Sequence, residues 1–350
     1  MIHDESGGSE GTSDQARQHV AGDARKRAKR RGGLLRWWDH TSESLRRKIK
    51  PLLKPLYRRF QIRSVIAWFV PGWGEVSKSP GGAALVGNLR PGHSTAPLIA
   101  AVGDFGSGKE PAFDVAQLIA AEGAQAVVTL GDNVYYQTGY QALVGNLYGE
   151  YLEAGAFFPA TGNHDYSEGR GIALFDRYFD FLGGHRWYRV TLGPFEFFML
   201  DSHQALHHPD IFTEQYDWLE AALADSTAQW KAVVVHHPPH SARSRSQKEF
   251  RFPYDKWGVD MVLSGHDHTM QHLEFDGVHY IVDGVGGGSL HKFEELLEGT
   301  QYRLAGRYGA FFMRPTDTGL HCYFKTTEGD VVHEFEIAAT SPAATSAPTR

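Results

Sequence analysis

"LIAAVGDF" at residues 98–105 and "AQAVVTLGD" at residues 124–132 are the two stretches that decide the fold of this chain. Each is a short apolar run that ends in an aspartate, and the helical pattern "PAFDVAQLIAAEG" of residues 111–123 separates them. Pro111 suits the first turn of a helix, and Gly123 suits the position just beyond its end. The order of strand, helix and strand predicts an open α/β sheet, in which sites lie outside the carboxyl ends of the strands.

More elements are expected downstream of this unit. The pattern "TEQYDWLEAALADS" predicts a helix that begins with Thr213 as its N-cap. Gly193-Pro194 is expected to turn the chain between two strands. Apolar or alternating runs predict strands in the segments 187–202, 231–237, 259–268, 272–284 and 321–337. This order favours an α/β fold with a two-sheet core flanked by helices.

Charge divides the chain into a basic N-terminal part and an acidic remainder. Residues 1–60 contain 15 Lys and Arg against 7 Asp and Glu, whereas the remainder contains 20 against 34. A basic extension on an acidic domain is the pattern that this indicates. The expected divisions are a disordered polar tail (1–23), a basic amphipathic extension (24–78), a Gly- and Pro-rich linker (79–96), the folded domain (97–338) and a disordered C-terminal tail (339–350).

The basic extension has two interpretations. Its apolar side packs on the folded domain, or residues 24–70 contact an anionic membrane surface. Pro51 and Pro55 disfavour one continuous helix, and nucleic acid is not expected because the stretch shows no binding motif beyond charge. No run reaches the roughly 20 apolar residues of a membrane span, so we expect a soluble or peripheral protein. A cytoplasmic location is favoured over export, and the oligomeric state is open.

Five segments carry the candidate chemistry. Cys322 is the only cysteine, so any metal must be held by His, Asp, Asn or Tyr rather than by a thiolate cluster. Each segment offers a hard oxygen or an imidazole nitrogen at a strand end or in a loop, and together they contain enough ligands for two ions that share a carboxylate. The segments are Gly103–Gly106, Gly131–Tyr135, Gly162–Asp165, His236–Pro239 and Gly265–His268.

This ordered set resembles the calcineurin-like metallophosphoesterase superfamily, and Tyr135 makes the chain similar to its purple acid phosphatase branch, of the tartrate-resistant type. The resemblance runs from about Pro97 to Ile337 and implies a four-layer α/β/β/α sandwich. It implies two metal ions, Fe³⁺ with Fe²⁺, Zn²⁺ or Mn²⁺, because a phenolate suits a hard trivalent ion. The implied ligands are Asp104, Tyr135 and His268 for the first ion, Asn163, His236 and His266 for the second, and Asp132 between them.

The resemblance also implies a reaction. Small phosphate monoesters would be hydrolysed by attack of metal-bound hydroxide, as in an acid phosphatase. His164 would protonate the leaving alkoxide, with Asp165 orienting its imidazole. The loop after His236 departs from the family pattern, because the expected later histidine is replaced by His237 and His240, followed by Arg243 and Arg245. Each of these four residues is a candidate for contact with the substrate, the two arginines by pairing with a phosphate oxygen or a second charged group. Among them we take His240 as a further catalytic candidate.

Two other functions stay open from the sequence. A phosphodiesterase or nucleotide hydrolase of the same superfamily would use the same ligands with a larger leaving group. A non-catalytic module that acts through the basic N-terminal arm is the other alternative, although intact ligand positions disfavour it. The group His203, His207 and His208 has no defensible metal-ligand spacing and is expected in a surface loop near the site.

Overall fold

The computed structural model describes residues 82–91, 96–135, 139–167, 172–243 and 246–339. The expected polar tail (1–23), the basic extension (24–78) and residues 340–350 lie outside this part of the chain. Within the part that is described, no helix combines the length and the apolar character needed to cross a membrane.

Two mixed β-sheets form the centre of the described structure. The larger sheet has the order β1-β5-β6-β7-β8-β10-β9-β11, and the smaller has the order β14-β13-β12-β2-β3-β4. The larger sheet contains β1 (Ala83–Val86), β5 (Tyr188–Leu192), β6 (Phe195–Leu200), β7 (Trp230–Val235), β8 (Met261–Ser264), β9 (Met270–Phe275), β10 (Val278–Asp283) and β11 (Thr300–Leu304). The smaller contains β2 (Ile99–Val102), β3 (Ala126–Thr129), β4 (Phe157–Pro159), β12 (Gly309–Pro315), β13 (Gly319–Thr326) and β14 (Val331–Ala338).

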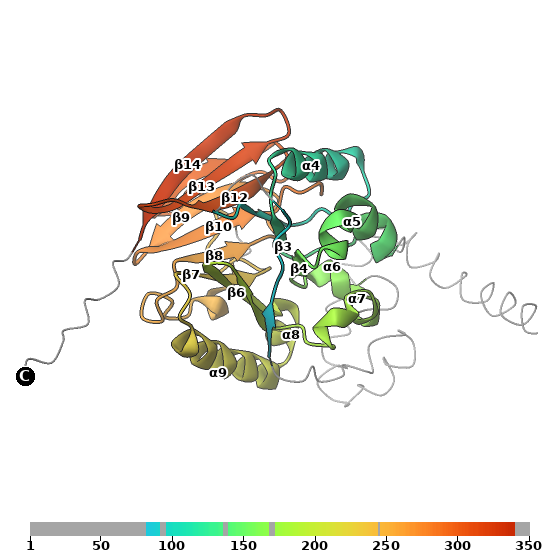
Figure 1. The fold of residues 1–350 in the computed structure, drawn as a ribbon. Helices are drawn as coiled ribbons and strands as arrows, with labels where there is room; N and C mark the ends of the chain where they lie inside the picture. The colour runs from blue at the N-terminus through green and yellow to red at the C-terminus, as the bar shows by residue number, and fades with distance from the viewer. Residues whose placement is uncertain (1–81, 92–95, 136–138, 168–171, 244–245, 340–350) are drawn as a thin grey trace, which may run out of the picture. The chain divides into compact units, whose positions relative to one another are not determined.

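Helices cover the outer faces of both sheets (Figure 1). The helices α4 and α5 lie beside the smaller sheet, and α8 and α9 lie on the opposite side of the molecule beside the larger one. The helices are α4 (Glu110–Ala121), α5 (Asn146–Glu153), α6 (Asn163–Ser167), α7 (Ala173–Tyr178), α8 (Ser202–His207) and α9 (Pro209–Asp225), with single turns at Gln141–Gly145, Asp180–Leu182 and Lys248–Phe250. The predicted four-layer α/β/β/α sandwich is confirmed.

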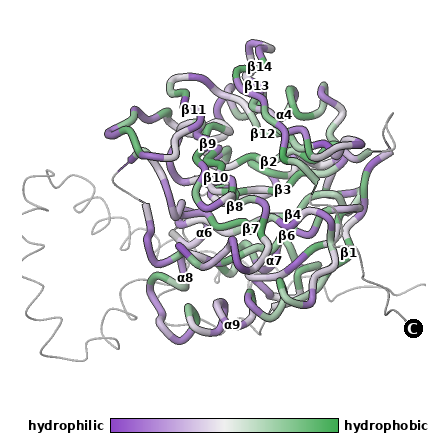
Figure 2. Tube along the Cα trace, turned by 90° about the vertical axis from the view of Figure 1, so that its left-hand side faces the viewer, coloured by the Kyte–Doolittle hydropathy of each residue, from purple (hydrophilic) through white to green (hydrophobic). Residues whose placement is uncertain are grey.

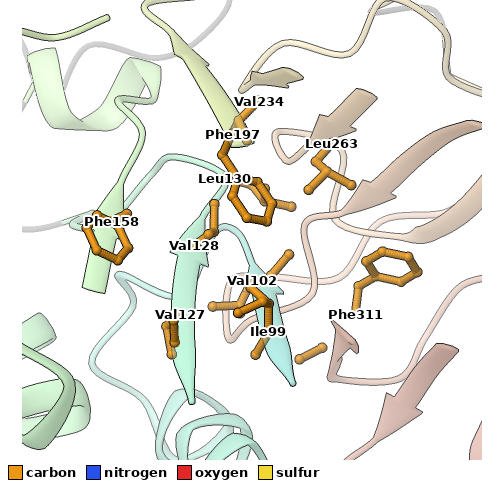
Figure 3. Close-up of a cluster of buried hydrophobic side chains, with 14 of the residues drawn as sticks. Ile99, Val102, Val127, Val128, Leu130, Phe158, Phe197, Val234, Leu263 and Phe311 are labelled. Atoms are coloured by element: carbon orange, nitrogen blue, oxygen red, sulfur yellow. The ribbon is translucent and has the colours of Figure 1, made fainter. Parts of the chain in front are cut away.

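The central strands β6, β7 and β8 of the larger sheet are mainly apolar and are buried on both faces. In β6, Phe197 joins the core between the two sheets, whereas its neighbour Phe198 packs in a second core with Leu219 of α9. Figure 2 shows mainly hydrophobic strands in the centre, and a helix α9 that alternates between hydrophilic and hydrophobic along its length. Figure 3 shows the core between the sheets, with Phe197, Val234 and Leu263 from one sheet and Val102, Val128 and Phe311 from the other.

The unit β2-α4-β3 forms as the sequence predicts. β2 and β3 pair in parallel, with Ala100 opposite Val127, and all four residues of each strand are buried. Pro111 lies in the first turn of α4. Gly123 follows the helix with a φ of +72°, a backbone conformation that favours glycine. Proline and glycine therefore mark the two ends of this helix.

The linker prediction for residues 79–96 is wrong for residues 83–86. These residues form β1, which pairs in parallel with β5 at the edge of the larger sheet, with Leu85 opposite Val190. The flanking glycines and prolines suggested a linker, but the short apolar run Ala83–Val86 gains backbone partners from an open sheet edge. The sheet therefore begins upstream of the expected domain start at residue 97.

The predicted N-cap Thr213 is also wrong. Helix α9 begins four residues earlier, at Pro209, with His208 as its N-cap residue. Proline suits a first helical turn, and the hydroxyl of Thr213 donates to the carbonyl oxygen of Pro209 at 3.0 Å, inside the helix. A threonine that satisfies its hydroxyl within the preceding turn does not need to begin the helix.

Candidate metal centre

The predicted ligands follow five parallel strands that belong to two different sheets. β2, β3 and β4 run parallel in the smaller sheet, and β7 and β8 run parallel in the larger. Asp104 follows β2, Asp132 and Tyr135 follow β3, Asn163 follows β4, His236 follows β7, and His266 and His268 follow β8. Because the two sheets are stacked, these strand ends meet. The structure brings all seven predicted ligands into one group, called the ligand cluster below.

The backbone is strained at three members of the ligand cluster. Asp104, Asp132 and His266 have φ values of +60°, +54° and +66°, a region that side chains with a Cβ rarely adopt. Only one other described residue that is not glycine, Asp276 in the turn between β9 and β10, has a positive φ. Strain of this kind concentrates at functional sites. Glycine is required beside the ligands, because a Cβ on Gly162 would lie 2.2 Å from Oδ1 of Asp132.

Asp104, Tyr135 and His268 form a triangle of potential ligand atoms. The hydroxyl oxygen of Tyr135 lies 3.0 Å from Oδ1 of Asp104 and 3.0 Å from Nε2 of His268. The same Nε2 lies 3.0 Å from the same Oδ1. Adjacent ligands of an octahedral ion with bonds of about 2.1 Å lie about 3.0 Å apart. The three atoms therefore have the spacing of one face of a metal coordination sphere.

Hydrogen bonds from the other side fix the tautomer of His268. Its Nδ1 lies 2.5 Å from the carbonyl oxygen of Ser289, and a carbonyl can only accept, so Nδ1 carries the proton. In the neutral ring, Nε2 is then an acceptor that faces a carboxylate oxygen of Asp104. Two facing acceptors need a positive charge between them. The donor set therefore fits a cation.

The pKa values reflect the same arrangement. Burial alone would raise the pKa of Asp104, but the charge and hydrogen bond of His268, with His236 and His266 nearby, lower it to about 2. For His268, burial is outweighed by the charge of Asp104, and the pKa is raised. Burial and the charges of Asp104 and Asp132 raise the pKa of Tyr135 well above its usual value. A phenolate at this position would need a strongly charged cation.

Asn163, His236 and His266 form the second group of ligand atoms. Oδ1 of Asn163 lies 3.2 Å from Nε2 of His236 and 3.0 Å from Nδ1 of His266. Nδ1 of His236 donates to the carbonyl oxygen of Leu130 at 2.7 Å, which leaves Nε2 as the acceptor. His236 is completely buried. The acceptor nitrogen of His236 and Nδ1 of His266 therefore lie on either side of the same Asn163 oxygen.

Asp132 lies between the two groups. Its Oδ1 accepts the backbone N–H of His164 at 2.8 Å and lies 3.5 Å from Nε2 of His236. Ligand atoms of Asp104, Asp132 and His236 all lie within 4.8 Å of one another. Burial and the charges of Asp104 and Asp165 raise the pKa of Asp132 well above its usual value. A second cation beside Asp132 would relieve that cost.

His164 and Asp165 lie in the first turn of the short helix α6, which begins at Asn163. The His164 side chain is 40% exposed, its ring centroid lies 4.5 Å from that of Tyr135, and its Nε2 lies 4.0 Å from Oδ2 of Asp132. Asp165 is buried and accepts from the backbone of Gly162 at 2.8 Å and from the hydroxyl of Tyr140 at 2.8 Å. Burial raises the pKa of Asp165 to about 6 against these hydrogen bonds. His164 is therefore at the mouth of the cluster, and Asp165 holds the loop beneath it.

The structure does not bring His240 into the ligand cluster. Its ring stacks on Phe275 at 4.1 Å and meets Tyr280 at 4.6 Å, two residues that pack on the α9 side of the larger sheet. Burial and the charge of Arg251 lower the pKa of His240 to about 4. The catalytic assignment of His240 is thus not supported by its position, because its ring packs against Phe275 and Tyr280 instead. Arg245 lies outside the described residues.

Arg243 is held by acidic side chains. Its guanidinium lies 3.2 Å from a carboxylate oxygen of buried Asp267 and 3.2 Å from one of Glu294. It also donates to the carbonyl oxygen of Lys292 at 2.6 Å. These contacts occupy the guanidinium, so Arg243 joins the loop Gly265–His268 to residues 292–294.

Two histidines lie beside the cluster. His237 was among the substrate contacts that the sequence left open, whereas His291 was not singled out from the sequence. His291 stacks on His268 at 4.1 Å with an angle of 1° between the rings, and its Nδ1 accepts the backbone N–H of His268 at 3.2 Å. His237 lies with its ring 4.5 Å from that of His266 and 5.0 Å from that of His236. The only sequence signals were the position of His291 after "GVGGGSL" and the doubled histidine in "HHPP".

The fold and the ligand cluster were compared with those of known protein families. Residues 97–270 match the family described as calcineurin-like phosphoesterase. The chain therefore carries a calcineurin-like phosphoesterase domain, and the resemblance inferred from the sequence is confirmed.

Individual relatives are purple acid phosphatases. The chain is 26% identical over 197 residues to purple acid phosphatase 17 of Arabidopsis thaliana, which covers 46% of this chain and 58% of the plant protein. It is 25% identical over 253 residues to tartrate-resistant acid phosphatase type 5 of Homo sapiens, which covers 58% and 77%. The match thus spans less than two thirds of the plant relative. These relatives support the predicted assignment as a phosphoester hydrolase.

Solved structures show the shared fold. A purple acid phosphatase from yellow lupin (Lupinus luteus) seeds superposes with a TM-score of 0.59 at 19% identity, over 72% of this chain and 55% of that one. A Plasmodium protein described as GAP50, the anchor in the inner membrane complex, superposes with a TM-score of 0.60 at 19% identity, over 71% and 91%. At these identities the likeness concerns the fold alone.

Proposed function

We propose that this protein is a dinuclear metal-dependent hydrolase of small phosphate monoesters. The observation that carries the proposal is the triangle of Asp104, Tyr135 and His268, in which three ligand atoms lie 3.0 Å from one another. The second group around Asn163 and Asp132 extends the same arrangement to a neighbouring cation position.

The proposed metals follow from the donor types. Asp104, Tyr135 and His268 would hold Fe³⁺, since carboxylate and phenolate oxygens suit a hard trivalent ion. Asn163, His236 and His266 would hold Fe²⁺, Zn²⁺ or Mn²⁺, with Asp132 shared. The two ions would supply charge neutralisation and Lewis acidity to the phosphoryl group.

The chain's own residues would bind and orient the ester. His164 lies at the exposed edge of the cluster, 4.0 Å from Asp132, where it would hold a proton on its imidazole and deliver it to the leaving alkoxide. Asp165 accepts the backbone N–H of Gly162 at 2.8 Å and the Asn133 side chain at 3.1 Å. These bonds would fix the loop that presents both Asn163 and His164. An orienting contact from Asp165 to the His164 imidazole remains part of the proposal.

A phosphodiesterase or nucleotide hydrolase is the second candidate. The position of His240, which packs against Phe275 rather than beside the ligands, leaves the leaving-group preference open, so this candidate stays beside the first.

The role of the basic arm, whether on an anionic membrane or on the folded domain, is a separate proposal. Deletion of residues 1–81 followed by binding to anionic vesicles tests it, because binding that survives the deletion excludes the arm.

The deciding experiment combines metal analysis, visible absorption and hydrolysis in the wild type and the Tyr135→Phe variant. We expect two metal ions per chain, a broad tyrosinate-to-iron band that the variant lacks, and faster turnover of p-nitrophenyl phosphate than of bis-p-nitrophenyl phosphate. Two ions without the band would reject ferric iron at Tyr135. Preferential turnover of the diester would favour the second candidate, and failure to bind metal would reject both.

A further inference from the structure

His237 lies against the second group of ligands without belonging to the predicted set. It is 6% exposed, and one ring nitrogen from each of His236, His237 and His266 lies within 4.8 Å of the others. Its Nδ1 is bonded to the hydroxyl of Ser202 at 2.8 Å. Nε2 is therefore the nitrogen that remains for the cluster.

We propose that His237 is a substrate-binding residue that donates a hydrogen bond from Nε2 to a phosphate oxygen, with Ser202 setting this tautomer. The inference rests on the proposed function, because it requires phosphate to bind at the ligand cluster. It identifies the residue that takes the place of the later loop histidine expected from the sequence. It also makes the first residue of α8 part of the site.

The direction of the hydrogen bonds follows from counting protons at Ser202. The backbone N–H of His237 lies 3.3 Å from Oγ of Ser202, and a backbone N–H can only donate, so Oγ accepts this bond. The single hydroxyl proton of Ser202 is then directed to Nδ1 of His237. The reverse direction would leave that proton without an acceptor among the described residues, although Ser202 is completely buried, and such a loss is costly.

The neighbouring histidines have the opposite tautomer. Nδ1 of His236 and Nδ1 of His268 each face a backbone carbonyl, so their Nε2 atoms carry lone pairs that suit a cation. His237 faces a hydroxyl instead, so its Nε2 carries a proton that suits an anion. Two consecutive residues, His236 and His237, are thereby prepared for opposite charges. A phosphate group between the metal positions and His237 would meet both.

The tautomer can be measured without any turnover. Long-range ¹H–¹⁵N spectra of the zinc-loaded full chain, labelled with ¹⁵N-histidine, report which nitrogen of each ring carries the proton, and the His237→Gln variant assigns the signal. We expect the proton on Nε2 of His237 in the wild type. In Ser202→Ala, which lacks the hydroxyl, we expect the signals of a mixture of both tautomers. A proton on Nδ1, or a metal-bound Nε2, would overturn the proposal even if the enzyme is active.

Phosphate affinity gives the second readout. Inorganic phosphate is titrated calorimetrically into metal-loaded wild type, His237→Phe and His237→Gln, with His321→Phe on the distant strand β13 as the matched control. We expect about tenfold weaker binding for His237→Phe, partial recovery for His237→Gln, whose amide still donates, and no change in the control. Metal content should stay at the wild-type value in all four proteins.

The outcomes separate this inference from the proposed function. Unchanged phosphate affinity in His237→Phe with both metals bound would overturn the role of His237 and leave the hydrolase intact. Loss of one metal in that variant would make His237 a ligand and also overturn the proposal. If the wild type binds no metal, the proposed function fails, and the phosphate role of His237 fails with it.

Discussion

The ligand cluster and a second group of histidines use the same side chain in opposite ways. The second group, called the histidine chain, consists of His272 on β9, His279 on β10 and His333 on β14. Nδ1 of His272 lies 2.9 Å from Nε2 of His333, and Nε2 of His272 lies 2.9 Å from Nδ1 of His279. The histidine chain thus links strands of the two different sheets.

The partners account for the difference. In the ligand cluster, Nε2 of His268 faces Asp104, and the pKa of His268 is raised. In the histidine chain, each short contact joins two imidazoles, and one N–H proton between the two nitrogens satisfies it while the rings are neutral. Protonation of neighbouring rings would place positive charges side by side, where they repel each other. Burial, followed by the charges of His279 and His333, lowers the pKa of His272 to about 3. A histidine whose Nε2 faces a carboxylate suits a cation, whereas His272, whose two ring nitrogens are both bonded to other imidazoles, has no nitrogen left for one.

The largest effect on metal binding and hydrolysis should come from removing the charge of Asp132, which lies between the two groups of ligand atoms in the ligand cluster. Asp132→Asn keeps the shape of the side chain but removes the charge that the cations would share. We expect loss of metal and a fall in hydrolysis on the order of 10³-fold or more, because metal stabilisation of the phosphoryl group is worth several kcal/mol. Metal analysis and kinetics check this. The metal-free variant should also unfold at a higher denaturant concentration than metal-free wild type, because the buried charge of Asp132, whose pKa is raised, destabilises the folded state and asparagine removes it. Full metal content in Asp132→Asn would contradict a shared carboxylate.

The five segments that carry the ligand cluster could be predicted from the sequence because they sit at strand ends or in loops, whereas the individual ligands were implied by the family resemblance. Buried runs such as Val127-Val128 and glycines such as Gly131 fixed where each loop leaves its strand, and parallel strands must direct their carboxyl ends to one edge. The bounds of α4 were predictable for a similar local reason, from Pro111 and Gly123. Local signals of this kind survive into the folded protein.

The remaining features depend on tertiary contacts that have no local signal. Ala83–Val86 become a strand only because the edge of β5 is open, and His240 leaves the site only because Phe275 and Tyr280 offer it a stack. The histidine chain joins residues 272, 279 and 333 from three strands. No spacing in the sequence connects His333 to His272, so such a chain appears only once both sheets are placed.

The second effect tests whether His164 acts as an acid at the edge of the ligand cluster. His164→Gln keeps a polar side chain but has no proton to deliver. We expect turnover of an alkyl phosphate to fall by about 10²-fold and turnover of p-nitrophenyl phosphate to fall less, because a good leaving group needs little protonation. Equal losses for both substrates, measured at the same metal content, would assign His164 to binding alone.

The third effect should appear in the histidine chain as a dependence of stability on pH. Unfolded histidine has a pKa of about 6.5, whereas that of folded His272 is about 3, so between these values only the unfolded chain binds the proton. The contribution of neutral His272 to the free energy of unfolding is therefore fully present above pH 6.5. It falls as the pH drops toward 3, by up to about 1.4 kcal/mol per pH unit. Glu274 and Glu334, which face His279 and His333, partly oppose the effect.

Urea unfolding at pH 7.5, 6.0 and 5.0 measures this slope. His272→Phe should be less stable than the wild type at pH 7.5, by about 1–3 kcal/mol for the lost hydrogen bonds, yet should lose less stability on acidification. Phenylalanine suits the space because the His272 ring already stacks on Phe335 at 4.0 Å. His185→Gln, at a histidine that belongs to neither group, serves as the control and should follow the wild-type slope. Parallel slopes for wild type and His272→Phe would show that the histidine chain does not carry the acid sensitivity.

The smallest effect should come from His291, which brings a histidine-to-histidine stack to the edge of the ligand cluster. Its ring lies parallel to that of His268 at 4.1 Å, and its Nδ1 accepts the His268 backbone N–H. His291→Ala should lower stability by about 1 kcal/mol through the lost stack and hydrogen bond. Because the Ser289 carbonyl still holds Nδ1 of His268, metal content should be unchanged and activity should fall only a few-fold. Loss of a metal ion would instead place His291 among the ligands. A pair of stacked histidines would then bind metal, which would contradict the contrast between the ligand cluster and the histidine chain.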